Sequence, residues 1–348
     1  MPSFPRLVAV LICCSGPLFA QPLRDLAVPR GVRIGTAVNP SRLSEELYAD
    51  TLSREFNQVE PENALKFGPV HPSPAEYNFG PPDSLAAFAS GHKMVMRGHT
   101  LVWHRQNPAW VTSGQHTPAE LASILQEHIK AVVGHYAGKV YAWDVVNEGF
   151  NDDGSMRSTL WFDAPGIGLK GTGYIEQALR WAHAADPRAL LFYNDYSAEW
   201  VNPKSDAIYK MAQDFQSRGV PLDGVGLQMH LTANAQPLAG MEANIKRITD
   251  LGLQVQITEL DVRLPVEAEG KAAGPALATQ AQIYQDIVAL CLKYSRCTAI
   301  QTWGFTDKYS WIPGSFRGTG AALEFDAVYQ PKPAYNAIQT ALRSATRK

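Results

Sequence analysis

Eight short apolar segments recur along the chain. Longer stretches separate them, and several of these stretches have a helical pattern. The segments lie at residues 32–38, 56–60, 93–98, 140–148, 190–195, 224–230, 253–259 and 298–305. Apolar residues recur at helical spacing in the intervening stretches 118–136, 173–186 and 202–219. Eight strands that alternate with helices are typical of a (β/α)8 barrel, whereas doubly wound sheets, the alternative, seldom need eight parallel strands. The pattern therefore predicts an α/β protein with a single-domain TIM barrel over residues 21–348.

The composition is compatible with a barrel of this size and narrows the choice of partner. Of the 348 residues, 45% are hydrophobic and 18% are charged, and the formal net charge is −2. Because no run of Lys or Arg stands out, we expect neither nucleic acid nor an anionic membrane surface as a partner. A neutral substrate fits this charge balance, and we expect a monomer.

The first twenty residues resemble a secretory signal peptide. Arg6 precedes an apolar stretch over residues 7–20, which is too short to span a bilayer, and cleavage after Ala20 would release a mature chain. A frayed hydrophobic N-terminus is the alternative. We expect export to the periplasm or the extracellular space, with no membrane attachment after the signal is removed.

The four cysteines divide between the predicted signal and the mature chain. Cys13 and Cys14 would leave with the signal, and Cys291 and Cys297 remain. Two cysteines separated by a short segment in an exported chain favour a disulfide, and two separate buried thiols are the alternative. No zinc-like Cys or His spacing is present, so we expect no metal and no cofactor.

Two carboxylates end predicted strands, and a TIM barrel places chemistry at the C-terminal ends of its strands. Glu148 ends the fourth strand and Glu259 the seventh, which lie on roughly opposite sides of the barrel mouth. Val255, Ile257 and Glu259 alternate onto one strand face, which points this carboxylate inward. A single such Glu is usually a solvated acid, but two that face one cleft suit glycosidic bond cleavage.

A histidine and a third carboxylate are expected beside Glu259. Gln228 and His230 share a strand face, and Asp261 lies two residues beyond Glu259. His230 can donate a hydrogen bond to Glu259 while Asp261 orients the imidazole, which would keep Glu259 ionised. A histidine that only satisfies a structural contact is the alternative.

Four motifs in this order and spacing resemble the family 10 glycoside hydrolases, chiefly endo-β-1,4-xylanases. In chain order they are RGHTLVWHRQNPAW, WDVVNE, GVGLQMH and ITELD, and the likeness runs from about Arg33 to Ala341. The resemblance implies a (β/α)8 fold and a retaining, double-displacement hydrolysis of internal β-1,4-xylosidic bonds in xylan. It implies that Glu148 is the acid/base and Glu259 the nucleophile. His230 and Asp261 match the residues that support the nucleophile.

The resemblance also implies a set of substrate-binding residues. Asn147 matches the amide that binds the 2-hydroxyl of the sugar being cleaved. Trp303 and Trp311 match tryptophans whose bulk crowds the place where glucose would carry its CH2OH group. The full set is Glu62, Asn63, Lys66, His99, Trp103, Gln106, Asn147, Gln228, Trp303 and Trp311. The family also pairs two cysteines that match Cys291 and Cys297, and it often has a cis peptide at the position of His99 and Thr100. The chain departs from the usual family residues at Phe67 and Ser197.

Other functions stay open from the sequence alone. An endo-glucanase or a mixed xylanase/glucanase is the nearest alternative, and an intracellular enzyme that trims short xylo-oligomers is another. A catalytically silent polysaccharide-binding barrel usually lacks one of the two carboxylates. A metal held by His99, His104 and Glu148 matches no usual zinc spacing.

Overall fold

The computed structural model describes residues 21–234, 238–267 and 270–344. The predicted signal peptide, residues 1–20, lies outside the described residues. None of the helices in the described ranges combines the length and the apolar character that crossing a bilayer requires.

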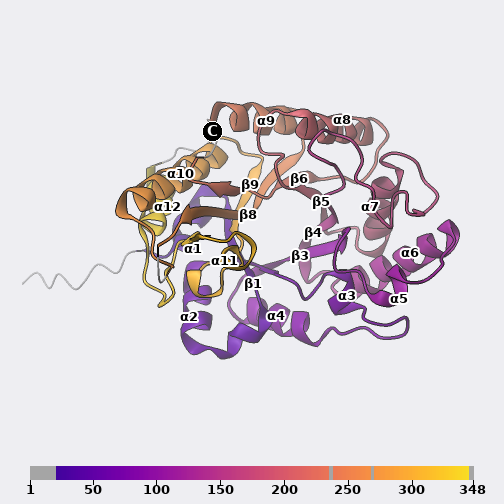
Figure 1. The fold of residues 1–348 in the computed structure, drawn as a ribbon, viewed down its shortest axis with the longest axis horizontal. Helices are drawn as coiled ribbons and strands as arrows, with labels where there is room; N and C mark the ends of the chain where they lie inside the picture. Colours follow the sequence, from indigo (N-terminus) through magenta and orange to yellow (C-terminus); the bar gives the residue numbers. More distant parts are fainter. Residues whose placement is uncertain (1–20, 235–237, 268–269, 345–348) are drawn as a thin grey trace, which may run out of the picture.

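Eight parallel strands close into a barrel, which confirms the predicted fold class (Figure 1). Around the barrel, each strand pairs with the next, and β9 pairs with β1 through Arg33 and Ala299 to close the ring. The strands are β1 (Arg33–Val38), β2 (Gln58–Pro61), β3 (Val95–Val102), β4 (Val140–Asn147), β5 (Leu190–Asp195), β6 (Gly224–Leu227), β8 (Gln254–Pro265) and β9 (Cys297–Thr302).

An α-helix follows each barrel strand and lies on the outer side of the ring (Figure 1). These helices are α2 (Glu46–Glu55), α4 (Gly80–Gly91), α6 (Pro118–His135), α7 (Gly173–Ala185), α8 (Pro203–Ser217), α9 (Leu238–Asp250), α10 (Gly274–Leu292) and α12 (Pro333–Ser344). The start of α6 is defined by a capping box, in which Thr117 and Glu120 exchange hydrogen bonds with each other's backbone N–H groups.

Short elements lie before β1 and in the connections between barrel strands and outer helices. They are α1 (Leu23–Ala27), α3 (Phe67–Val70), α5 (Ala109–Thr112) and α11 (Ile312–Ser315), the 3-10 turns η1 (Val28–Arg30), η2 (Pro40–Ser44) and η4 (Asp307–Tyr309), and the strands β7 (His230–Thr232) and β10 (Thr319–Gly320).

Several predicted strands differ from those observed, and the largest differences lie near the barrel mouth, where the strand predicted over 298–305 already ends at Thr302. The strand predicted over 224–230 is broken after β6, because Met229 has a φ of 65°, and the chain resumes as β7 beside β8. β8 continues to Pro265 rather than ending at Glu259. β3 continues to Val102 through a cis peptide between His99 and Thr100, the bond that the resemblance implied.

Consecutive residues of β3 face opposite sides of the barrel wall. A Cβ on Gly98 would lie 2.2 Å from a ring carbon of Trp143, so a glycine is required where β3 passes this indole. Arg97, on the same strand, is fully buried and hydrogen bonds to Glu60 and Gln256. The residues between strands and outer helices form the apolar core.

Cys291 and Cys297 form the predicted disulfide, with an S–S distance of 2.02 Å. The bond joins the end of α10 to the start of β9. It therefore lies at the N-terminal end of a barrel strand, at the opposite end of that strand from the mouth.

Candidate active site

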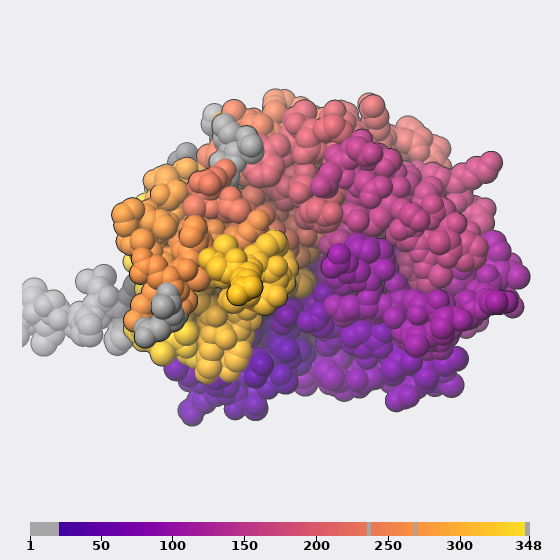
Figure 2. Space-filling view, viewed as in Figure 1, coloured from indigo at the N-terminus to yellow at the C-terminus, as the bar shows by residue number. Residues whose placement is uncertain are grey.

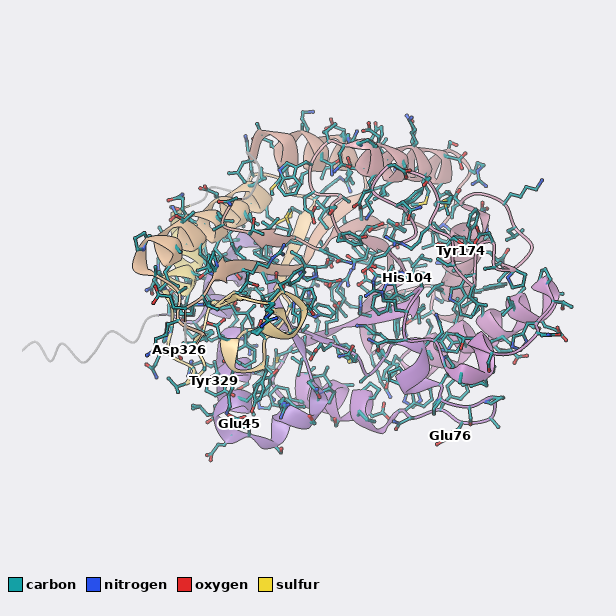
Figure 3. All side chains as sticks on the ribbon, viewed as in Figure 1. Glu45, Glu76, His104, Tyr174, Asp326 and Tyr329 are labelled. Carbon is teal, nitrogen blue, oxygen red and sulfur yellow. A yellow bond between two sulfur atoms is a disulfide. The ribbon has the colours of Figure 1, made fainter. Side chains whose placement is uncertain are left out.

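The predicted site residues gather around one cleft of about 630 Å³ at the C-terminal ends of the strands. Figure 2 shows a hollow near the middle of this face, between yellow atoms of the C-terminal part of the chain and magenta atoms. His104, another cleft residue, lies nearer the middle of the molecule in Figure 3 than Glu45 and Glu76, which lie at the periphery. The predicted residues that line the cleft are Glu62, Asn63, Lys66, His99, Trp103, Gln106, Asn147, Glu148, Gln228, His230, Glu259, Trp303 and Trp311.

Asp261 is fully buried behind the cleft wall and completes a chain of polar contacts. Nδ1 of His230 lies 2.9 Å from Oδ2 of Asp261, and Nε2 of His230 lies 3.0 Å from Oε2 of Glu259. Trp311 donates its indole N–H to the same Oδ2 of Asp261 over 2.8 Å. The chain therefore couples Glu259 to a tryptophan of the cleft wall through His230 and Asp261.

The charges along this chain keep Glu259 ionised. Burial by itself lowers the pKa of His230, but the charges and hydrogen bonds of Asp261 and Glu259 outweigh it and raise the pKa to about 10. Burial by itself raises the pKa of Glu259, but the hydrogen bond from His230 and the charges of His99 and His230 outweigh burial and lower it. At neutral pH, a cationic imidazole therefore holds an anionic Glu259.

Glu148 lies at a sharp turn directly after β4. Its φ is 58°, in the left-handed region that non-glycine residues rarely occupy. The turn is fixed from three directions: the Glu148 N–H donates to the carbonyl of Asn194, Arg157 donates to the carbonyl of Glu148 over 2.9 Å, and the Gly149 N–H donates to the hydroxyl of Tyr193 over 2.8 Å. These contacts hold the carboxylate in the cleft, where its side chain is 13% exposed.

A buried ion pair lies behind this turn. Tyr193 donates its hydroxyl to Asp195, and the ammonium of Lys204 lies 2.8 Å from Oδ1 of Asp195. The same ammonium lies 3.5 Å from the ring centroid of Tyr196, which also lines the cleft. Removing either partner would leave a buried charge unpaired, which is strongly destabilising, so the Lys204–Asp195 contact helps to keep Tyr193 in place behind the turn.

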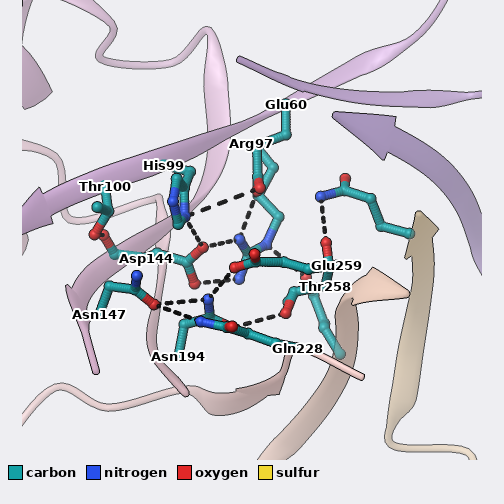
Figure 4. Close-up of polar contacts among 12 residues, drawn as sticks. Glu60, Arg97, His99, Thr100, Asp144, Asn147, Asn194, Gln228, Thr258 and Glu259 are labelled. Atoms are coloured by element: carbon teal, nitrogen blue, oxygen red, sulfur yellow. Dashed lines mark hydrogen bonds and ion pairs between the residues drawn. The ribbon is translucent and has the colours of Figure 1, made fainter. Parts of the chain in front are cut away.

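Side-chain amides connect the two carboxylates, and Figure 4 shows the part of this network around Asn147, Asn194 and Glu259. Asn194 donates to Oδ1 of Asn147 over 3.0 Å and to Oε1 of Glu259 over 2.8 Å. Gln228 donates to the same Oδ1 of Asn147 over 3.1 Å and to Oε1 of Glu148 over 3.2 Å. The two acids therefore belong to one hydrogen-bond network even though they come from β4 and β8.

One end of the cleft is built around a buried lysine. Lys66 is 6% exposed, and it donates to Asn63, which also accepts a hydrogen bond from Gln106. The ammonium lies 4.7 Å from the ring centroid of Trp103 and 5.4 Å from that of Trp303. Burial lowers the pKa of Lys66. Polar groups beside flat aromatic faces suit the hydroxyls and C–H faces of a sugar ring.

The guanidinium of Arg97 lies buried beneath the cleft among acidic residues. Glu60, His99 and Asp144 place potential ligand atoms within 4.8 Å of one another, the spacing of a metal site. However, the Arg97 guanidinium hydrogen bonds to Glu60 over 2.6 Å and makes two hydrogen bonds to Asp144 (Figure 4). The carboxylates are thus compensated without an ion, and His99 is oriented by Asp144 over 2.9 Å.

The metal set considered from the sequence does not come together in the described part of the chain. Nδ1 of His104 lies 3.7 Å from Oε2 of Glu148, while His99 hydrogen bonds to Asp144 instead. Burial lowers the pKa of His104 to about 4, so this imidazole is neutral beside Glu148.

The two departures from the family pattern are accommodated differently. Phe67 stacks on His128 with ring centroids 3.7 Å apart and keeps an aromatic group beneath the cleft wall. Ser197 lines the cleft and has a φ of 52°.

Sequence reasoning missed several residues that shape the site. Tyr193 lies inside a strand pattern, where it was indistinguishable from barrel packing, and Arg157 lies in the long loop between β4 and α7. Asn194 had a signal, because it lies in the Asn-Asp-Tyr run where β5 ends. Glu199 and Arg263 also line the cleft, and no motif distinguished them.

The chain is similar over most of its length to known proteins. The family model described as glycosyl hydrolase family 10 matches residues 22–341. Endo-1,4-beta-xylanase B of Thermotoga neapolitana is 42% identical over 97% of this chain and 97% of that protein. An endo-1,4-beta-xylanase of Agaricus bisporus is 38% identical over 95% and 98% of the two chains.

Solved structures agree with this relationship. Xylanase 10B from Thermotoga petrophila, in complex with xylobiose, superposes with a TM-score of 0.88 at 44% identity and covers 92% of this chain and 97% of that one. An intracellular xylanase from Thermoanaerobacterium saccharolyticum superposes with a TM-score of 0.82 at 34% identity, over 91% and 97% of the two chains. The barrel, the family match and these similarities together establish that the chain belongs to glycosyl hydrolase family 10.

Proposed function

We propose that the protein is an endo-1,4-β-xylanase that hydrolyses internal bonds of xylan with retention of anomeric configuration. The observation that carries the proposal is the pair Glu148 and Glu259, which line one cleft and share one amide network. The relatives named as xylanases support the choice of substrate.

In the first step, Glu259 attacks the anomeric carbon while Glu148 protonates the departing glycosidic oxygen. His230 keeps the nucleophile anionic, and the bond from Asn194 aims its other oxygen. Asn147 holds the 2-hydroxyl, and that bond tightens as the ring flattens toward the oxocarbenium-like transition state.

In the second step, the same Glu148 acts as a base. Glu148 gave up its proton to the departing oxygen in the first step, so it enters the second step as a carboxylate. It removes a proton from the water that attacks the anomeric carbon, and the bond to Glu259 breaks. Two inversions at one carbon give net retention.

The cleft wall favours xylose over glucose in this proposal. Trp303 and Trp311 lie beside His230, with ring centroids 6.4 Å and 4.9 Å from its imidazole. Their bulk leaves little room for an exocyclic CH2OH group, so steric rejection adds to attraction in discriminating the two sugars. Comparing rates on xylan and on carboxymethyl-cellulose separates this proposal from an endo-glucanase.

Export is part of the proposal and rests on the predicted signal peptide together with the disulfide. N-terminal sequencing of the protein recovered outside the cytoplasm tests it directly: a chain beginning near Gln21 supports export, and a chain that keeps residues 1–20 contradicts it.

The residue roles are tested with Glu148→Gln and Glu259→Gln, using the exposed Glu76→Gln as a control. We expect Glu259→Gln to lose activity on every substrate. Glu148→Gln should lose about 10²–10⁴-fold in kcat/KM on xylan, and far less on an aryl xylobioside whose leaving group needs no proton. If Glu148→Gln cleaved xylan at the wild-type rate, the assignment would be wrong.

A further inference from the structure

We propose that Arg263 forms a subsite for the carboxylate of an acidic side group on the xylan chain, such as a uronic acid. This inference rests on the proposed function and adds a preference among xylans to it. The ligand chemistry is that of a carboxylate carried by a sugar, bound at the rim of the cleft.

The position of Arg263 connects it to the reacting centre. It follows Glu259 and Asp261 on the same face of β8, and it lines the cleft. Four residues of extended strand place it up to about 13 Å beyond Glu259. A side group that projects from a sugar near the cleavage point can therefore reach it.

The Arg263 guanidinium lies over an aromatic ring, and its N–H groups are left open. It lies 4.0 Å from the ring centroid of Phe316, and Phe316 packs against Trp311 with ring centroids 5.5 Å apart. Trp311 in turn bonds to Asp261 over 2.8 Å. Stacking on an aromatic ring fixes the plane of an arginine and leaves its N–H groups free to bind a ligand.

The Arg263 guanidinium has no hydrogen-bond or ion-pair partner among the described residues, unlike the other arginines of the site. Arg97 is neutralised by two buried carboxylates, and Arg157 spends its N–H groups on two backbone carbonyls and a tyrosine. Arg105, the other cleft arginine, donates its Nε to His104 over 3.2 Å. The half-buried Arg263 is therefore the cleft cation with the most unused hydrogen-bonding capacity in the described ranges.

A carboxylate uses this group better than a sugar hydroxyl does. The planar fork of arginine matches the two oxygens of a carboxylate, and a charge-assisted pair is roughly twice as strong as a neutral hydrogen bond. The neighbouring acids do not supply this partner: Glu259 and Asp261 bind His230 instead of Arg263.

The test compares one polysaccharide in two charge states: a glucuronoxylan and the same material after chemical reduction of its carboxyl groups. Full-length wild type is compared with Arg263→Gln, Arg263→Lys and a control, Arg188→Gln. The Arg188→Gln substitution removes the same charge at the N-terminal end of the barrel, where the Arg188 side chain is 78% exposed.

We expect Arg263→Gln to lose about two- to fivefold in kcat/KM on the acidic xylan, mainly through KM, and to match wild type on the reduced xylan. Arg263→Lys should recover part of the loss, and Arg188→Gln should lose nothing. In wild type, the preference for the acidic form should shrink toward one in 1 M NaCl, because salt screens the pair.

Equal losses on both substrates would overturn the inference, because they would mean that Arg263 binds neutral sugar or only supports the fold. No loss on either substrate would overturn it as well. If Arg263→Gln does not fold, the wild-type salt dependence decides, and a preference unaffected by salt is the contradicting result. Failure of wild type to cleave the reduced xylan would instead count against the proposed function alone.

Discussion

Asn194 donates a hydrogen bond to Glu259 over 2.8 Å, although the two residues are separated by 65 positions in the sequence. The second N–H of the same amide reaches Asn147, and the amide oxygen accepts a hydrogen bond from Thr258 over 2.7 Å. One buried amide therefore sets the spacing between the proposed nucleophile and the group proposed to hold the 2-hydroxyl.

Asn194→Ala should lower both activity and stability. It leaves Oε1 of Glu259 and the hydroxyl of Thr258 without a buried partner and removes one of the two donors to Oδ1 of Asn147, which costs about 1–3 kcal/mol per unsatisfied group before relaxation. We expect kcat/KM on xylan to fall by about 10–100-fold and the urea midpoint to drop. Thr258→Val, which keeps both Asn194 donors, is the matched control. If this control lost as much activity as Asn194→Ala, the amide would not be the positioning group.

Tyr193→Phe removes the hydroxyl that accepts from the Gly149 N–H and donates to Asp195. The turn that carries Glu148 then loses one of its supports, so proton donation should suffer more than nucleophilic attack. We expect kcat/KM to fall about tenfold on phenyl xylobioside and much less on dinitrophenyl xylobioside, as measured by initial rates. Equal losses on the two substrates would point to a general loss of structure.

Stability should depend on pH through His230. Its pKa is raised to about 10 in the folded protein, so folding favours the protonated form. The resulting stabilisation is complete below the ordinary pKa near 6.5, falls by at most about 1.4 kcal/mol per pH unit above it, and is gone above pH 10. The difference in urea unfolding free energy between wild type and His230→Gln should therefore shrink from pH 6.5 to pH 10. A difference independent of pH over this interval would contradict the charged state of His230.

The disulfide should contribute to stability and leave catalysis alone. Cys291 and Cys297 are separated by 6 positions and close a small loop at the far end of β9 from the mouth. The Cys291→Ala, Cys297→Ala double variant should lose roughly 2 kcal/mol of unfolding free energy and keep the wild-type kcat/KM at 25 °C. Wild type in reducing agent is the matched comparison, and a large fall in kcat/KM for a fully folded double variant would contradict this separation.

The sequence placed Glu259 near the end of a barrel strand, but alternation along that strand did not correctly predict which face is interior. Gln256 hydrogen bonds to the interior Arg97, so Val255 and Ile257 face outward rather than into the barrel. The register of β8 against β9 shifts between Ile257 and Leu260, and Glu259 lies in this irregular segment and lines the cleft. The break at Met229 was not predictable either. It depends on β7 finding a pairing position on β8, which is a contact between segments and carries no local signature.

The supports of the two acids were predictable only in part for the same reason. His230 and Asp261 stood out because a titratable group at a strand end is unusual. Tyr193 and Arg157 act on the Glu148 turn from another strand and from an irregular loop. Their residue types are ordinary for those places, so only the folded arrangement distinguishes them.

The anomeric configuration of the first product tests the central claim most directly. The purified mature chain is incubated with xylan in an NMR tube, and the anomeric proton of the new reducing end is followed from the earliest time points. Two displacements by Glu259 and then water predict that the β-anomer appears first and drifts to the α/β equilibrium by mutarotation. Initial appearance of the α-anomer, or no cleavage of xylan, would contradict the account.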